Sequence, residues 1–366
     1  METGKISQRQ LLFIIILTAL SPAVFFVPQV AARAVAQDAW IPPLIAGIWS
    51  VLNVMVIFAL AKRYPGATII EYLPMVLGKP LGKFFALLYT LWYFSVSSFA
   101  LRSFGIFLNV SVMPETPILA FTVTMLLLSF YAIRNGLESW ARVNEIIGPL
   151  VLLAIVGIAI LPMGFADFRR LLPVGEHSMG QLIVPSFIQA SMRGQLIVAC
   201  MFIPALASLK NATRNFSWTI LAVGLIPALL NFSAIVVFGG VNMGILEFPI
   251  YSLARIIDVA RIINRLELIL VIAWVMGSFT LVTTFAYCSV RATTQLLGFK
   301  DYQRLLFPVA VVILALSDNI WQNMARFMEF VADAWGGYGL LSFELVIPSV
   351  ILLISVLRKH RVEGTA

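Results

Sequence analysis

Ten long apolar stretches fill most of this chain, and they limit its possible folds more than any other feature. A run of about 20 apolar residues is long enough to cross the hydrocarbon core of a bilayer as a helix. Backbone groups facing lipid must be hydrogen-bonded internally, which favours helices. We therefore predict an all-α polytopic membrane protein with about ten transmembrane helices. The predicted spans are residues 10–32, 41–61, 84–108, 117–134, 144–163, 182–208, 216–240, 266–290, 305–322 and 339–357.

The composition supports this class of protein. Of the 366 residues, 61% are hydrophobic and 11% are charged, whereas soluble domains carry roughly 25% charged residues. The net charge of +8 comes from basic residues scattered among the loops. This distribution predicts contact with a lipid bilayer and no nucleic-acid partner. No polar stretch is long enough to form a separate soluble domain, so residues 1–366 are predicted to form a single transmembrane domain.

The beginning of the chain has two possible interpretations. Lys5 and Arg9 precede an apolar run, as they would in a signal peptide. The run continues over residues 11–30, which is long enough to span, and no clear small-residue cleavage site follows it. We interpret this run as a retained first span.

The distribution of basic residues predicts the orientation. If the N-terminus is cytoplasmic, 16 Lys and Arg residues fall in inner segments and 7 in outer segments; Arg102 and Arg193, inside spans, complete the 25. Cytoplasmic loops carry the excess of Lys and Arg. An even number of spans also puts both ends on one side, so both termini are predicted to be cytoplasmic.

Two spans are interrupted near their middle, and the interruptions predict a binding site. The first is broken at residues 20–23 (Leu-Ser-Pro-Ala) and the sixth at residues 191–194 (Ser-Met-Arg-Gly). Ten spans divide into five plus five, and an odd number per half inverts the second half. We predict inverted repeats over about 10–163 and 182–357, with broken helices 1 and 6 as in LeuT-like transporters. Paired broken helices mark the substrate site of many secondary transporters.

The predicted ligand site combines these breaks with polar residues of spans three and eight. The ends of half-helices bind carboxylate and ammonium groups, so such a site suits an amino acid without any charged side chain. The hydroxyl residues have a second interpretation, because small polar residues also allow close helix packing. The candidate ligand-binding residues are Thr18, Leu20, Ser21, Pro22, Ala23, Tyr93, Ser97, Ala190, Ser191, Arg193, Gly194, Ser278 and Thr283.

Two charged residues inside spans leave alternatives open. Arg193 either pairs with a carboxylate of the ligand or of a gate, or forms a structural pair with an acid on another helix. Glu344 is either a proton site, the partner of Arg193, or a shallow residue near the outer interface.

Two connecting segments are more than simple links. Residues 66–83 are too short and too interrupted to cross, so we expect them at the inner surface. In residues 251–267, Arg255, Asp258, Arg261 and Arg265 share one helical face, which predicts an amphipathic helix at the outer surface. That helix is either an interfacial anchor or a lid over an outward-facing cavity.

The sequence contains no catalytic constellation. Cys200 and Cys288 lie inside apolar stretches, and His177 and His360 lie in loops far apart in the sequence. No cluster has metal-ligand spacing, and neither a phosphate-binding loop nor a nucleophile elbow is present. We predict a protein that is not an enzyme and carries no cofactor or metal.

The chain resembles a known family along nearly its whole length. It is similar to the B subunit of the nutrient germinant receptors of bacterial endospores, which form the spore permease branch of the amino acid–polyamine–organocation transporters. The segments that carry the resemblance are Ile6-Ser7-Gln8-Arg9-Gln10, Gln37-Asp38-Ala39-Trp40, Arg63-Tyr64-Pro65-Gly66, Glu71-Tyr72, Leu77-Gly78, Arg134-Asn135-Gly136-Leu137-Glu138, Ala141-Arg142-Val143-Asn144-Glu145, Phe248-Pro249 and Arg265-Leu266-Glu267.

This resemblance implies a transporter-like fold with two inverted five-helix repeats. It also implies a receptor that senses a small nutrient, typically an amino acid, in the spore inner membrane, beside a larger A subunit and a lipoprotein C subunit. The chain departs from its relatives at both breaks: Ser21-Pro22 replaces a common glycine, and Gly194-Gln195 replaces a frequent Gly-Glu. The alternatives are an ion-coupled amino acid permease and a membrane scaffold that binds no ligand.

Overall fold

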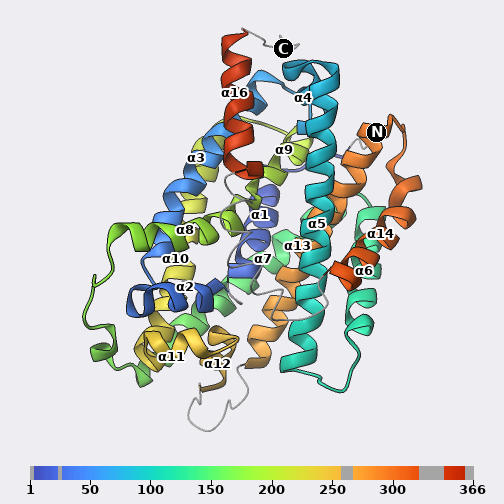
Figure 1. Cartoon of the computed structure of the whole chain (residues 1–366). Helices are drawn as coiled ribbons and strands as arrows, with labels where there is room; N and C mark the ends of the chain where they lie inside the picture. The colour runs from blue at the N-terminus through green and yellow to red at the C-terminus, as the bar shows by residue number, and fades with distance from the viewer. Residues whose placement is uncertain (1–3, 24–26, 257–266, 321–341, 359–366) are drawn as a thin grey trace.

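The computed structural model describes residues 4–23, 27–256, 267–320 and 342–358, and the regular elements in these ranges are helices (Figure 1). The elements before the sixth span are α1 (Gln8–Ala23), α2 (Val27–Val35), η1 (Ala36–Asp38), α3 (Pro42–Arg63), α4 (Ile69–Leu77), α5 (Lys79–Ser111), α6 (Ile118–Arg134), α7 (Leu137–Ile160), η2 (Leu161–Phe165) and η3 (Phe168–Leu171). The later elements are α8 (Met179–Gly194), η4 (Gln195–Val198), α9 (Ala199–Phe202), η5 (Ile203–Ala205), α10 (Ala212–Phe238), α11 (Gly240–Ile245), α12 (Pro249–Ile256), α13 (Glu267–Leu297), η6 (Tyr302–Leu305), α14 (Leu306–Ile320) and α16 (Ile347–Leu357).

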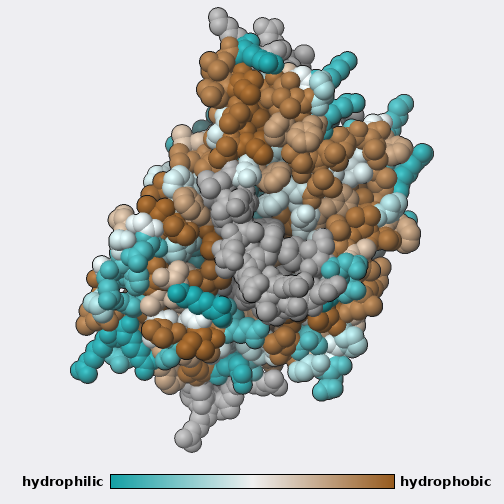
Figure 2. All heavy atoms as spheres, in the orientation of Figure 1, coloured by the Kyte–Doolittle hydropathy of each residue, from teal (hydrophilic) through white to brown (hydrophobic). Residues whose placement is uncertain are grey.

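The helices form a bundle whose surface suits a lipid environment. Six described helical segments are long and apolar enough to cross a membrane: Pro42–Arg63, Lys79–Ser111, Leu137–Phe165, Met179–Ala205, Ala212–Phe238 and Glu267–Leu297. Three shorter apolar helices cover Gln8–Ser21, Ile118–Arg134 and Ser342–Leu357. Figure 2 shows apolar atoms over the upper part of one face, where α4 and α16 lie. The predicted all-α membrane architecture is confirmed.

Both interrupted spans change direction, but slightly later than the sequence predicted. In Figure 1, α1 runs along the bundle, whereas α2 and α8 lie across it. Residues 20–23 are still helical, because α1 ends at Ala23 and α2 begins at Val27. A proline ends or kinks a helix because it lacks the N–H group and its ring meets the carbonyl four residues earlier, which agrees with the end of α1 one residue after Pro22. In the sixth span, α8 continues to Gly194 and tightens into the 3₁₀ turns of η4.

Segments predicted to be on the inner side meet at one end of the bundle. The backbone N–H of Ile6 donates to Ala205 O at 2.9 Å, which joins the chain before α1 to the chain after α9. Arg358, after α16, donates from Nη1 to Val76 O of α4 at 2.8 Å. The arrangement agrees with the predicted even number of crossings between the two ends of the chain.

Segments predicted to be on the outer side meet at the opposite end. Arg33 of α2 donates from Nε to Gly244 O of α11 at 2.9 Å. Gln37 of η1 donates from Nε2 to Pro173 O at 3.2 Å. Of the predicted amphipathic helix over 251–267, α12 covers the beginning, while residues 257–266 lie outside the described ranges. The proposed lid therefore stays a prediction.

The inner-surface segment after α3 forms a short helix packed on α5. The nine residues of α4 are too few to cross a bilayer, as predicted. Thr68 and Glu71 cap its first turn reciprocally. Gly82 of α5 lies so close to α4 that a Cβ at this position would overlap the backbone of Pro74.

We expect Gly82→Ala to destabilise the protein by about 1–3 kcal/mol, because neither backbone at this contact has room to move. Thermal unfolding in detergent, followed by size-exclusion recovery, measures the effect. Gly157→Ala on α7 is the matched control, since a Cβ there meets no atom within 4 Å. Equal melting temperatures for the two variants would contradict the close approach.

Candidate functional site

Two pairs of hydroxyl groups join α1 to α13 inside the bundle. The Oγ atoms of Ser21 and Ser278 lie 3.1 Å apart, and the Oγ1 atoms of Thr18 and Thr284 lie 3.4 Å apart. All four residues are buried. The pairs are one helical turn apart on α1, because residues three apart share a helix face. The structure thus brings together three of the predicted site residues, Thr18, Ser21 and Ser278.

The hydroxyl pairs lie deep in the bundle. Ser21 is 13 positions after Gln8, the first residue of α1, which corresponds to a rise of about 20 Å. Ser278 is 11 positions after Glu267, where the described part of α13 begins, a rise of about 17 Å. Ser21 and Ser278 thus lie between about half and two thirds of the way across a hydrocarbon core of about 30 Å. These residues therefore lie near the middle of the predicted spans.

A small closed cavity lies beside Ser21. Its volume is about 10 Å³, room for no more than a single water molecule. The cavity is lined by Leu17, Leu20 and Ser21 of α1, Val151 and Ile155 of α7, and Leu270, Ala273, Trp274 and Gly277 of α13. Binding of an amino acid between α1 and α13 therefore requires these helices to move apart from the closed arrangement.

Three further predicted residues carry buried hydroxyl groups. Tyr93 and Ser97 of α5 and Thr283 of α13 are fully buried. Their hydroxyl oxygens have no hydrogen-bond partner among the residues that the structure describes. The Tyr93 ring lies 6.3 Å from the ring of Phe285 on α13. Burying a hydroxyl group without a hydrogen-bond partner costs free energy. These three groups are therefore available to a ligand or to water.

The predicted residues of α8 are divided between different neighbours. Ala190 packs against Ala46 of α3, and the Ser191 hydroxyl donates to Ile188 O of its own helix at 3.0 Å. Arg193 is buried and donates from Nη2 to Gly224 O of α10 at 3.3 Å. Its Nη1 has no partner in the described part of the chain.

The contacts of Arg193 are with α3 and α10 rather than with the hydroxyl pairs. A Cβ on Gly47 of α3 would lie 3.9 Å from Arg193 Nη1, and a Cβ on Gly224 would lie 3.0 Å from it. Among the described residues, neither Arg193 nor Glu344 forms an ion pair, so the hypothesis that they pair with each other is wrong. Pro22, Ala23 and Gly194 end their helices, and the structure does not describe their side chains.

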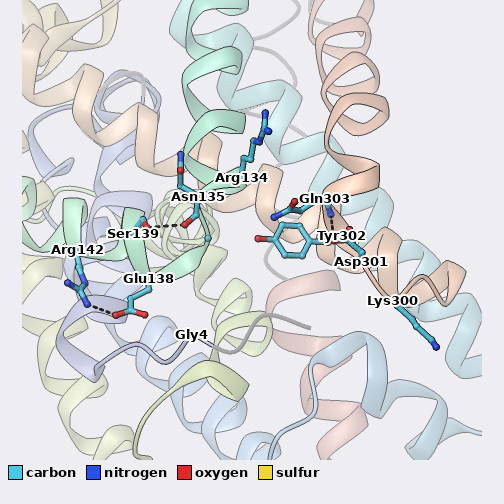
Figure 3. Close-up of a pocket in the computed structure, with 11 residues that line it drawn as sticks. Gly4, Arg134, Asn135, Glu138, Ser139, Arg142, Lys300, Asp301, Tyr302 and Gln303 are labelled. Atoms are coloured by element: carbon cyan, nitrogen blue, oxygen red, sulfur yellow. Dashed lines mark hydrogen bonds and ion pairs between the residues drawn. The ribbon is translucent and has the colours of Figure 1, made fainter.

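An open surface pocket lies elsewhere, at the end of the bundle where the segments predicted to be on the inner side meet. Its volume is about 720 Å³, and it lies between the α6–α7 and α13–α14 connections. Figure 3 shows that Arg134 and Lys300 point in different directions, while Arg142 is paired with Glu138. The charged groups that line this surface pocket do not converge on one point, so we do not assign a ligand site to it.

An acid–imidazole contact fixes the outer ends of both broken spans. The buried carboxylate of Asp38, which follows α2, accepts from Gly175 N at 2.8 Å and lies 2.9 Å from His177 Nδ1. Burial raises the pKa of Asp38, but the hydrogen bonds from Gly175 and His177 outweigh it and hold the pKa below its usual value. Ser178, the next residue, caps the start of α8.

We expect this contact to weaken only in acid. Because the pKa of Asp38 is lower in the folded protein than in the unfolded chain, its contribution to stability is complete above about pH 4 and is lost as the pH falls through the folded-state value. Hydrogen exchange of the Gly175 amide measures this, with Asp38→Asn expected to exchange faster than the wild type near neutral pH and the difference to shrink in acid, where Asp38 is protonated. Asp167→Asn, in the neighbouring turn, is the control. Protection of Gly175 that is unchanged in Asp38→Asn would contradict the assignment.

Sequence reasoning missed several residues that the structure places at this site. Thr284 completes the second hydroxyl pair, and its signal was its spacing from Ser278 and Leu281 on one helix face. Gly277 faces Ser21 across the α1–α13 contact, since a Cβ there would lie 3.5 Å from Ser21 Cβ, in van der Waals contact. Glu344 is fully buried within the bundle, and its depth in the membrane stays a prediction.

The described residues contain no group of three or more His, Cys, Asp or Glu side chains arranged to hold a metal ion. Cys200 and Cys288 are buried free thiols. The interior of the bundle thus offers hydroxyl groups, aromatic rings and two isolated charges. This chemistry suits reversible binding of a small molecule.

Two broken spans in a helical bundle, with hydroxyl pairs between the first of them and α13 at mid-depth, define a transporter-like, multi-pass integral membrane protein. The same fold occurs in MhsT, solved in complex with L-phenylalanine: the TM-score is 0.68 at 13% identity, covering 97% of this chain and 99% of that one. The chain belongs to the spore germination protein family, whose profile matches residues 5–324. Family and fold point to a receptor or transporter rather than an enzyme.

Curated relatives from Bacillus subtilis (strain 168) match over nearly their whole length. Spore germination protein KB is 28% identical over 99% of this chain and 98% of its own. Spore germination protein YndE is 26% identical over 98% of both chains. Spore germination protein A2 is 22% identical over 97% of both chains. The family resemblance inferred from the motifs is confirmed.

Proposed function

We propose that this protein is the membrane subunit of a germinant receptor, which binds a small nutrient, an amino acid, at mid-membrane depth and triggers germination together with partner subunits. The observation that carries the proposal is the set of buried hydroxyl groups inside the bundle: the two pairs that join α1 to α13, and the groups on α5 and α13 that are unpaired in the described structure. Tyr93, Ser97 and Thr283 have no partner in the described structure, and Ser21 and Ser278 bond only weakly to each other at 3.1 Å. Membership of the spore germination protein family supports the receptor role.

The proposed mechanism is a shift between a closed and an open state. The cavity beside Ser21 holds about 10 Å³, so the ligand binds a state in which α1 and α13 lie farther apart. A ligand shifts such an equilibrium only by its difference in affinity for the two states. The bound state would then be recognised by partners at the inner end of the bundle.

The cellular setting of this proposal follows from the family and from charge. We propose that the chain lies in the spore inner membrane with both termini in the cytoplasm, because the predicted inner segments carry most of the Lys and Arg residues. The proposed partners are the A and C subunits of a germinant receptor. The names of the curated relatives, all spore germination proteins, support this setting.

Direct binding tests the proposal. A panel of radiolabelled amino acids and sugars would be measured against the purified protein in nanodiscs, with Ser21→Trp as the variant whose site is blocked. We expect saturable binding of at least one amino acid, lost in the variant. Saturable binding that Ser21→Trp leaves unchanged would place the site elsewhere, and no binding by any compound would favour a scaffold or a site completed by partner subunits.

A second candidate function is an ion-coupled amino acid permease. The observation that favours it is Glu344, a carboxyl group buried inside the helical bundle, since intramembrane carboxyls often relay protons in transporters. Reconstituted vesicles distinguish the two functions. Accumulation of a bound amino acid under a proton or sodium gradient would indicate transport, and binding without accumulation would indicate a receptor.

A further inference from the structure

Glu344 is an isolated acid in the interior of the bundle. Its side chain is fully buried, and neither Oε1 nor Oε2 has a hydrogen-bond partner in the described structure. A carboxylate in such surroundings costs several kcal/mol unless it is paired and hydrogen-bonded, whereas the neutral acid costs far less. The surroundings of Glu344 therefore favour a bound proton.

The backbone around Glu344 is also unusual. Residues 342–346 form wider π-helical turns immediately before α16. The hydroxyl of Tyr89 on α5 donates to Phe343 O at 2.8 Å, and the Phe343 ring stacks on Trp92 at 4.8 Å. Turns of this kind are frequent at functional sites, and here two aromatic residues of α5 hold Phe343, the residue before the acid.

Among the described residues, the groups that face Glu344 include no cation. From α5 the titratable group is Tyr89, whose hydroxyl is already engaged with Phe343 O. From α3, Arg63 and Tyr64 bond to Ser355, 11 positions beyond Glu344 and about 16 Å along the helix. Helix α4 contacts the far end of α16, where Arg358 bonds to Val76 O. No basic residue of the described chain forms an ion pair with Glu344.

Helix α5 connects Glu344 to the candidate ligand site. Tyr89 and Tyr93 lie one turn apart on the same face of α5, with ring centroids 6.3 Å apart. Tyr93 in turn faces Phe285 of α13. A movement of α5 relative to α16 therefore changes the surroundings of Glu344 and of the predicted ligand residues together.

We propose that Glu344 is a proton-binding site whose occupancy is linked to opening of the bundle. In the closed state the carboxylic acid keeps its proton. When α5 and α16 separate and water enters, the O–H bond breaks, the proton passes to water, and the carboxylate keeps the electron pair. The inference stands on the burial, the missing partners and the π-helical turn, and it does not depend on which nutrient the protein binds.

Infrared spectroscopy of the ligand-free protein in nanodiscs tests whether the proton is present. At about pH 7.5, more than three units above the ordinary carboxyl values of about 3.9–4.3, exposed acids are ionised. We expect a protonated carboxyl C=O band in the wild type, its absence in Glu344→Gln, and its retention in Asp318→Asn. Asp318 is a suitable control because it is exposed and paired with Arg102. A wild-type spectrum without this band would overturn the proposal, whatever the variant does, and so would a band that persists in Glu344→Gln.

The link to opening is tested through the two native thiols. Cys200 and Cys288 are buried, so their rate of labelling by a thiol reagent reports opening. We expect the ratio of wild-type to Glu344→Gln labelling rates to rise with pH, by up to about tenfold per unit for one linked proton. The intrinsic pH dependence of the thiols cancels in this ratio. A ratio that stays constant with pH would overturn the link, and a ratio that changes with sodium instead of pH would assign the site to a metal cation.

Discussion

Spores whose only copy of this protein carries Ser21→Trp are expected to lose nutrient-triggered germination while retaining the protein in the membrane. Ser21 is buried between α1 and α13, beside a cavity of about 10 Å³. An indole at this position would occupy the space that opens for a ligand and would remove the hydroxyl that meets Ser278 at 3.1 Å. Loss of the site should lower the response at least a hundredfold, because overpacking and lost contacts together exceed about 2.8 kcal/mol.

The matched control for this variant is Ser129→Trp. Ser129 is an equally buried serine on α6, and its hydroxyl has no partner in the described structure. The control imposes the same overpacking at a helix that carries none of the hydroxyl groups of the proposed site. Immunoblots of inner membranes and dose–response curves for germination would be compared. A normal response in Ser21→Trp, or an equal loss in both variants at equal abundance, would contradict the proposed site.

Arg193→Met is expected to stabilise the isolated protein while weakening its response. Arg193 is buried, makes one long hydrogen bond to Gly224 O at 3.3 Å, and leaves Nη1 unpartnered in the described structure. An arginine at the centre of a span costs about 2.5–3.5 kcal/mol on insertion scales, and replacing a buried charge by an apolar residue of similar size often stabilises by about 1–4 kcal/mol. Methionine fills the same space without the charge, so we expect a gain of about 2 kcal/mol.

Thermal unfolding in nanodiscs measures this gain, and Arg102→Met is its control. Arg102 also lies within a span, but it is paired with Asp318 at 3.0 Å, so the same substitution there should lower stability or leave it unchanged. Destabilisation by Arg193→Met would show that the charge has a favourable partner in the membrane. Unchanged germination in the variant would remove Arg193 from the proposed function.

The sequence predicted the helical class, and it named three of the hydroxyl groups that meet between α1 and α13. Hydropathy over 20 residues marks the spans because lipid imposes one length and one polarity. It also placed Ser21 and Ser278 near mid-depth, and they meet in the structure. It placed Arg193 at the same depth, but depth says nothing about direction around the helix axis. Helix α8 lies across the bundle (Figure 1), so Arg193 contacts α10 instead.

Burial was the least predictable property. Glu344 lies five positions inside its predicted span, which indicated a shallow residue. In the structure it is fully buried, because the aromatic residues of α5 cover the turn that carries it. This burial depends on contacts between helices that are far apart in the sequence. The hydropathy of a single helix carries no information about those contacts.

The motifs that identified the family hold helices together at the inner end. Arg9 pairs with Glu145 at 2.9 Å, and Gln10 donates to the same carboxylate at 3.1 Å. The neighbouring Asn144 accepts a hydrogen bond from Thr280 of α13. These residues tie α1 to α7, and α7 to α13. The motifs therefore report the shared scaffold, whereas the two departures from the family lie at the breaks, where we propose that the ligand binds.

The backbone bridge between the two repeats has a mechanical consequence. Ile6 donates to Ala205 O at 2.9 Å and accepts from Ala207 N at 3.0 Å. The chain before α1 and the chain after α9 are therefore hydrogen-bonded side by side. We expect a tilt of one broken helix to move the other with it. Under the proposed function, a partner subunit at this end would then meet the same displacement, whichever of the two helices the ligand moved first.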